Sequence, residues 1–154
     1  MARKIVPVTR GRMTMSACPV PEHEFGEHRG EERLIVRAAT LGDALVEAAQ
    51  ALAELQGVHG PVADQSPWRT IEVTAADRAG LLIEWLNELI FLAESEHWVP
   101  MNFMVEAALP TRFRARAQGV VLPVAPSRIK AATWHGLRFD SHNGMLEAEV
   151  VLDV

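Results

Sequence analysis

The amino-acid sequence predicts an α+β sandwich in which a largely antiparallel sheet packs against two main helices. Two segments carry apolar residues at helical spacing, and about six or seven others have the composition or alternation of strands. The helices and strands are grouped rather than strictly alternating, which favours an antiparallel sheet. With 154 residues, 49% of them apolar, the chain is long enough to bury the core of one ordinary domain.

The first 21 residues differ from the rest of the chain. They carry basic residues and prolines without a sustained period, so we expect residues 1–21 to be an extended or disordered lead-in. The folded domain is then predicted to span residues 22–154. Its first predicted strand is short and covers residues 34–38, which are apolar and rich in β-forming side chains.

Thr40 and the residues after it predict the first helix. Thr40 is a favourable N-cap residue, and Asp43 follows three positions later as an acidic variant of the capping box. Apolar residues then recur at helical spacing until Gly57, which is a natural helix end. After a loop, the pattern predicts a strand and then the strongest helix of the sequence, at residues 68–74 and 76–94.

From residue 100 onward the pattern changes to strands. Pro110 separates two segments that we interpret as a hairpin, and a turn precedes the terminal strand. The predicted strands are residues 101–109, 111–117, 129–135, 137–139 and 145–154, with the turn at residues 140–144.

Aromatic and basic residues in these elements have simple structural interpretations. Trp85 and Trp134 are expected to be core aromatics, because such rings bury large areas. Arginines occupy one face of the strand at 111–117, and we interpret that face as solvated rather than as a contact for an acidic protein or a phosphate surface. These arginines are Arg112, Arg114 and Arg116.

Composition and motifs exclude several classes of function. A net charge of −5 disfavours direct nucleic-acid binding. Cys18 is the only cysteine, so an internal disulfide and a thiolate metal cluster are excluded, which fits a reducing cytoplasm. No segment reaches the length of a membrane span, and we expect a soluble cytoplasmic protein. The sequence has no nucleophile elbow, phosphate loop or zinc-protease motif, so no catalytic residue is predicted.

The chain end is one candidate site. Asp153 stands one residue before the α-carboxylate of Val154, so two anionic groups are crowded at the end of a predicted strand. Such oxygen ligands suit a hard cation such as Ca²⁺ or Mg²⁺. The alternative interpretation is an ordinary solvated terminus.

A second candidate lies near the start of the domain, where residues 21–32 contain five glutamates and two histidines. We interpret this segment first as a solvated polar loop. The spacing of His23 and His28 does not match a helical pair, and nothing supplies a second ligand pair for zinc.

Several segments together resemble the archease family, the small proteins that assist the GTP-dependent tRNA-splicing RNA ligase. They are Leu81-Leu-Ile-Glu-Trp-Leu-Asn-Glu-Leu-Ile-Phe91, Lys130-Ala-Ala-Thr-Trp-His135 and Ala148-Glu-Val-Val-Leu-Asp-Val154. The order of the segments fits as well, and the resemblance covers about residues 22–154. It implies an archease-like two-layer sandwich.

The resemblance also implies a functional site. Glu31, Asp153 and Val154 would bind a divalent cation, Ca²⁺ or Mg²⁺, with Glu27 and His28 beside them, and Lys130 would contact the partner. Both acidic positions in the first segment are aspartates in the family. Glutamate carries one more methylene than aspartate, so the ligand set differs in length here.

Three functions follow from this resemblance and from the carboxylates. The first is a non-enzymatic activator or chaperone of an RNA ligase in tRNA splicing, which promotes the guanylylation and turnover of the ligase. The second is a metal-dependent hydrolase that uses the same carboxylates with His28 as the base. The third is a chaperone of a tRNA-modifying methyltransferase.

Overall fold

The structure is a computed structural model that describes residues 19–28 and 30–154, with only the backbone of residues 27 and 28. Most of the predicted lead-in, residues 1–18, lies outside the described residues. Within the described part, two α-helices and seven β-strands follow one another as β1 (Glu22–His28), β2 (Glu31–Ala38), α1 (Leu41–Leu55), β3 (Arg69–Thr74), α2 (Arg78–Glu96), β4 (Trp98–Leu109), β5 (Arg112–Val121), β6 (Ala131–His142) and β7 (Met145–Asp153).

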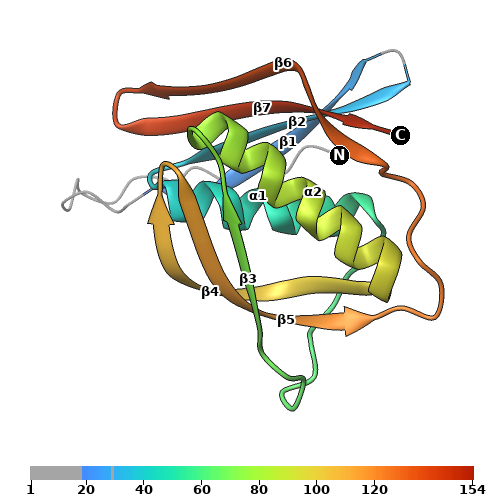
Figure 1. The fold of residues 1–154 in the computed structure, drawn as a ribbon. Coiled ribbons are helices and arrows are strands. Elements are labelled where there is room, and N and C mark those ends of the chain that lie inside the picture. The colour runs from blue at the N-terminus through green and yellow to red at the C-terminus, as the bar shows by residue number, and fades with distance from the viewer. Residues whose placement is uncertain (1–18, 29) are drawn as a thin grey trace, which may run out of the picture.

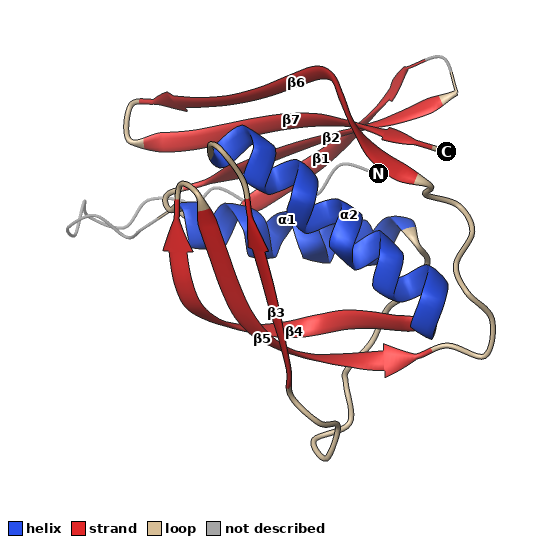
Figure 2. Ribbon diagram, in the orientation of Figure 1, coloured by secondary structure: helices blue, strands red, loops and turns tan. Residues whose placement is uncertain are grey.

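The strands form two antiparallel sheets rather than the single sheet that we expected. The order is β1-β2-β7-β6 in the four-stranded sheet and β3-β5-β4 in the three-stranded sheet. Figure 1 and Figure 2 show the two helices lying between these sheets. The predicted α+β class, with antiparallel strands and two main helices, is confirmed. No helix of the described chain is both long and apolar enough to cross a membrane.

Both helices begin at side-chain caps. Thr40 caps α1, where its hydroxyl oxygen accepts a hydrogen bond from the Asp43 amide at 3.1 Å, as the sequence predicts. Asp77 caps α2 by accepting from the Gly80 amide at 2.8 Å. His97 ends α2 in the left-handed conformation. Local sequence therefore determines where these helices start and stop.

Trp85 anchors the core between the sheets. Its indole N–H donates to the Leu45 carbonyl of α1 at 2.8 Å, so the side chain joins the two helices. Phe113 of β5 and Phe103 of β4 lie edge-on to its ring, with centroids 4.8 Å and 5.9 Å away. The expected burial of Trp85 is confirmed, since it is fully buried.

Trp134 is not a core residue, and that prediction was wrong. Its side chain is 62% exposed. The register of β6 with β7 shifts between Thr133 and Arg138, and Gly136 has a φ of 67°. This irregularity interrupts the alternation of inward and outward side chains, so the strand pattern no longer determines the direction of Trp134.

The predicted polar loop at residues 21–32 is instead the β1–β2 hairpin. His23 is buried, and Phe25 packs against the core. Glu22 and Glu24 lie on the other face, where Arg37 of β2 approaches both carboxylates at 3.7 Å and 3.3 Å. A charged segment forms a strand here because its charges are paired across the hairpin.

The β6–β7 connection is a two-residue hairpin turn. Asn143 and Gly144 have φ values of 52° and 76°, which is the positive-φ pair of a type I′ turn. The strands predicted at 129–135 and 137–139 are joined into the single strand β6.

The arginine face of β5 is a solvated sheet face, as predicted. Arg112 and Arg114 pair with Glu72 of β3, and Arg114 also pairs with Glu106 of β4. The opposite face of β5 is fully buried at Phe113, Ala115 and Ala117.

Candidate functional site

The end of β7 lies between two strands that are distant in sequence. Asp153 is directly opposite Glu31 of β2 on one side and Ala131 of β6 on the other. The Lys130 amide also donates a hydrogen bond to the Asp153 carbonyl at 2.8 Å. Figure 1 shows the chain end meeting β2 and β6 at the same end of the four-stranded sheet. The fold thus brings together Glu31, Asp153 and the start of β6.

Glu31 and Asp153 project from the same face of the sheet. Side chains directly opposite one another on antiparallel strands lie on one face, with Cβ atoms about 5 Å apart. This face points away from the helices, because Leu34 and Leu152 alternate with the two acids and are buried. Asp153 and Val154 are exposed to solvent, and Glu31 is partly exposed. Two carboxylates are therefore adjacent at a solvated edge.

The carboxylates of Glu31 and Asp153 are suitable ligands for a hard cation, because Ca²⁺ and Mg²⁺ prefer carboxylate oxygens. Among the described residues, no group of three or more His, Cys, Asp or Glu side chains is arranged to hold a metal ion. A cation at Glu31 and Asp153 therefore needs the α-carboxylate of Val154 or a side chain from the β1–β2 turn as a further ligand. Cation binding stays a prediction.

Glu27 and His28 belong to that turn. Their side chains lie outside the described residues, but their backbones pair with Glu32 and Glu31 respectively. The turn of the hairpin is consequently next to the chain end, because Glu31 is paired with His28 on one side and with Asp153 on the other.

Lys130 flanks the site on the β6 side. Its side chain is exposed, and it lines a cavity of about 500 Å³ between the C-terminal half of α2 and the loop before β6. The cavity is lined by Glu94, Ala125, Pro126, Ser127, Ile129 and Lys130. Arg128, in the same loop, pairs with Glu32 of β2 at 2.5 Å and so ties this loop to the sheet.

Asn87 of α2 is a positioning residue that sequence reasoning missed. Its amide nitrogen donates to the Ala132 carbonyl at 3.2 Å, and its amide oxygen accepts from the Ala132 amide at 2.8 Å. The side chain thus occupies the place of a neighbouring strand at the free edge of β6. A polar amide between buried apolar residues of α2 was the signal in the sequence that pointed to it.

His23 forms a second polar cluster, inside the fold. Its Nδ1 is 2.6 Å from Glu47 Oε1, and its Nε2 is 2.9 Å from Glu54 Oε2. Burial alone lowers the pKa of His23, but the hydrogen bonds and charges of Glu47 and Glu54 outweigh it and raise that pKa above 6.5. Both ring nitrogens lie within hydrogen-bond distance of a carboxylate oxygen, so neither is open to a metal or a substrate, and we interpret this cluster as structural.

Comparison with known proteins identifies similar chains. Residues 23–154 match the model of the "Archease protein family (MTH1598/TM1083)". A protein archease from Methanopyrus kandleri is 30% identical over 83% of this chain and 96% of its own length. One from Methanothermobacter thermautotrophicus is also 30% identical, over 56% of this chain and 66% of its own length. This chain spans only half the length of another, from Pyrobaculum neutrophilum, with 35% identity.

Two solved structures share the fold. The solution structure of Methanobacterium thermoautotrophicum protein 1598 has a TM-score of 0.64 at 23% identity, covering 86% of this chain and 98% of that one. The crystal structure of an archease described as a possible chaperone, from Thermotoga maritima, has a TM-score of 0.61 at 16% identity. It covers 94% of this chain and all of its own.

Proposed function

Because the chain belongs to the archease family, we propose that it is a non-enzymatic chaperone that activates the RNA ligase of tRNA splicing. The observation that carries the proposal is the convergence of Glu31, Asp153 and Lys130 at one end of the four-stranded sheet. These residues match those that the family resemblance assigns to the cation and to the partner.

A protein client agrees with the charge of the chain. The net charge of −5 disfavours direct contact with the phosphates of RNA, so an effect on RNA processing acts through a protein. The single cysteine fits a protein of a reducing compartment such as the cytoplasm, where we propose that it acts. The Thermotoga maritima relative is itself described as a possible chaperone.

The carboxylates of Glu31 and Asp153, with the α-carboxylate of Val154, are the proposed ligands of Ca²⁺ or Mg²⁺. Glu27 and His28 are proposed to support them from the adjoining turn. When bound, the cation supplies a positive charge that neutralises the crowded carboxylates at this edge. The chain itself holds the ligands in register through the β2–β7 ladder and the Lys130 amide bond to Asp153.

Lys130 is the proposed contact to the ligase. Its backbone is fixed beside the chain end, while the residue is exposed to solvent and lines the cavity. A mobile cation on a fixed backbone suits recognition of an acidic or phosphate group at the active site of a nucleotide-using partner.

A turnover assay tests the proposal. Purified ligase from the same organism is incubated with GTP, a divalent cation and an excess of cleaved RNA, with and without this protein. We expect multiple turnovers only when the protein is present, loss of that effect in Lys130→Ala and Asp153→Asn, and full effect in the exposed-loop control Asp64→Asn. Equal ligation rates with and without the wild-type protein would exclude the function.

A further inference from the structure

The solvent-facing side of α2 carries an unusual set of residues. Positions 84, 88, 91 and 94 follow one another at spacings of four, three and three, so they share one side of the helix. They are Glu84, Glu88, Phe91 and Glu94. We name this set, together with Trp134, the α2 face. In Figure 1 helix α2 lies between the edge strands β6 and β3.

The three glutamates of the α2 face differ in their pairing from glutamates elsewhere on the surface. Within the part of the chain that the structure describes, none of them forms a salt bridge. Glutamates elsewhere on the surface are paired with arginines, as Glu72, Glu96 and Glu147 illustrate. The α2 face therefore presents negative charge that no salt bridge among the described residues neutralises, whereas the glutamates on the outer face of the three-stranded sheet are paired with arginines.

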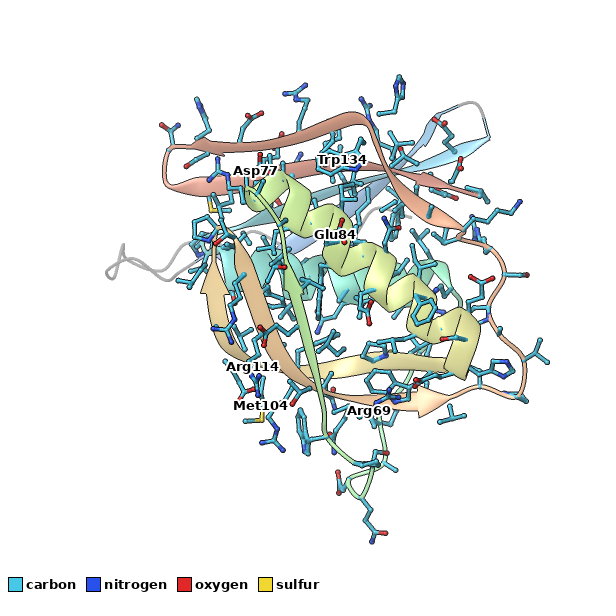
Figure 3. All side chains as sticks on the ribbon, in the orientation of Figure 1. Arg69, Asp77, Glu84, Met104, Arg114 and Trp134 are labelled. Atoms are coloured by element: carbon cyan, nitrogen blue, oxygen red, sulfur yellow. The ribbon has the colours of Figure 1, made fainter. Side chains whose placement is uncertain are left out.

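Two large aromatic side chains border these charges. Phe91 is 58% exposed and Trp134 is 62% exposed. Trp134 lies against the first turn of α2, because a Cβ added at Gly80 would be 3.1 Å from its ring. Figure 3 shows Trp134 beside the start of α2, with Glu84 farther along the helix. Exposed aromatics of this kind are enriched at the centres of protein interfaces.

The α2 face is continuous with the candidate site at the chain end. Glu94 contributes to the 500 Å³ cavity that Lys130 also lines. The Lys130 amide is in turn bonded to Asp153. A partner that reaches the chain end along this side of the molecule would therefore pass over α2.

We propose that the α2 face docks a lysine- and arginine-rich segment of the client protein, whose apolar side chains pack against Phe91 and Trp134. Cations of that segment pair with Glu84, Glu88 and Glu94, and a guanidinium group stacks on the indole of Trp134. A nucleic acid does not fit this face, because its phosphates would meet the same unpaired carboxylates. The identity of the client as the RNA ligase rests on the proposed function.

Two binding measurements test the proposal, each with the double variant Glu84→Lys/Glu88→Lys and with Trp134→Ala. The first probe is a labelled peptide of alternating arginine and leucine, and the second is the purified cognate ligase. Asp64→Lys is the control for added positive charge, and Met104→Ala, on the outer side of the three-stranded sheet, is the control for loss of an exposed apolar side chain. Far-UV circular dichroism and thermal unfolding verify that each variant is folded.

We expect the double variant and Trp134→Ala to bind both probes about tenfold more weakly or worse, and the controls to stay within about twofold. If the double variant binds the ligase as tightly as the wild type does, the α2 face is not the docking surface. The proposed function is still supported in that case if the wild-type protein activates the ligase. If the wild-type protein does not bind the ligase, the proposed function fails. The peptide affinities of the variants then test the docking face by themselves. If the double variant and the control Asp64→Lys bind the peptide with equal affinity, the α2 face is not the docking surface.

Discussion

The side-chain amide of Asn87 makes both of its hydrogen bonds with the backbone of one residue, Ala132, on the edge strand β6. A helix side chain here completes a sheet edge. Because Ala132 follows Lys130 by two residues, this pair also fixes the segment whose amide is bonded to Asp153. Asn87 therefore links α2 to the start of β6, which lies beside the chain end.

Replacing Asn87 should destabilise the fold. Asn87→Ala leaves the amide and carbonyl of Ala132 without protein partners, which should lower the free energy of unfolding by about 1–3 kcal/mol. Asn87→Asp keeps the acceptor but loses the donor, so a smaller loss is expected. Urea unfolding measures both, with Asn102→Ala as the control, since Asn102 is exposed and makes a single long hydrogen bond of 3.4 Å. A loss in Asn87→Ala no larger than the control would contradict this role.

The stability of the protein should fall as pH rises above about 6.5. Burial lowers the folded-state pKa of His23, but the hydrogen bonds and charges of Glu47 and Glu54 together outweigh burial and raise this pKa above 6.5. The stability from protonated His23 is fully present below the unfolded-state pKa and is lost as pH passes through the higher folded-state pKa. Urea unfolding from about pH 6 to about pH 9 measures this loss.

His23→Gln is the control for that pH dependence, since glutamine does not titrate. Its stability should vary less between pH 6.5 and higher pH than that of the wild type. His23→Ala should cost about 3–5 kcal/mol, because Glu47 then stays buried without its cation. Parallel pH profiles for the wild type and His23→Gln would show that another group is responsible.

Gly119 of β5 is expected to tolerate no side chain. A Cβ at this position would be 2.5 Å from the Val99 carbonyl oxygen and 2.7 Å from the Trp98 ring. Gly119→Ala should therefore lower the free energy of unfolding by about 1–3 kcal/mol in chemical denaturation. Gly26→Ala is the matched strand control, since its Cβ would meet only Arg33 at an ordinary 3.5 Å. Similar stabilities of the two variants would refute the close approach.

Divalent cations should raise the thermal unfolding temperature if the chain end binds them. An ion present at one hundred times its dissociation constant stabilises a folded protein by about 2.7 kcal/mol. Asp153→Asn should abolish the shift with Ca²⁺ or Mg²⁺, and Glu31→Asp tests whether the shorter side chain of the family binds more tightly. Asp64→Asn, in an exposed loop, should respond like the wild type. No shift with either ion in the wild type or in Glu31→Asp would remove the cation from the proposal.

Local patterns in the sequence predict the two helices and the two faces of β5 correctly. The Thr40 cap, the apolar periods of α1 and α2, and the alternation of Phe113 with its neighbouring arginines each depend on residues close in the chain. Nearby residues decide these features because backbone hydrogen bonds and side-chain direction repeat over one or two turns or strand pairs. The same segments also carry the family resemblance.

Contacts between distant segments decide the rest, and the acidic hairpin is the clearest case. Glu22 and Glu24 enter a strand because Arg37 pairs with them, and His23 is buried because helix α1 supplies two carboxylates. A register shift in β6 exposes Trp134, although tryptophan usually favours the core.

The residue sequence by itself establishes the family, the two helices and the acidic chain end. Tertiary structure alone determines that Asp153 lies opposite Glu31, 122 positions earlier in the chain. No local pattern determines that β7 pairs with β2. That pairing depends on the burial of Leu34 and Leu152 against the same helices. The shared burial of these two leucines is the physical reason that the adjacent acids meet on the opposite face.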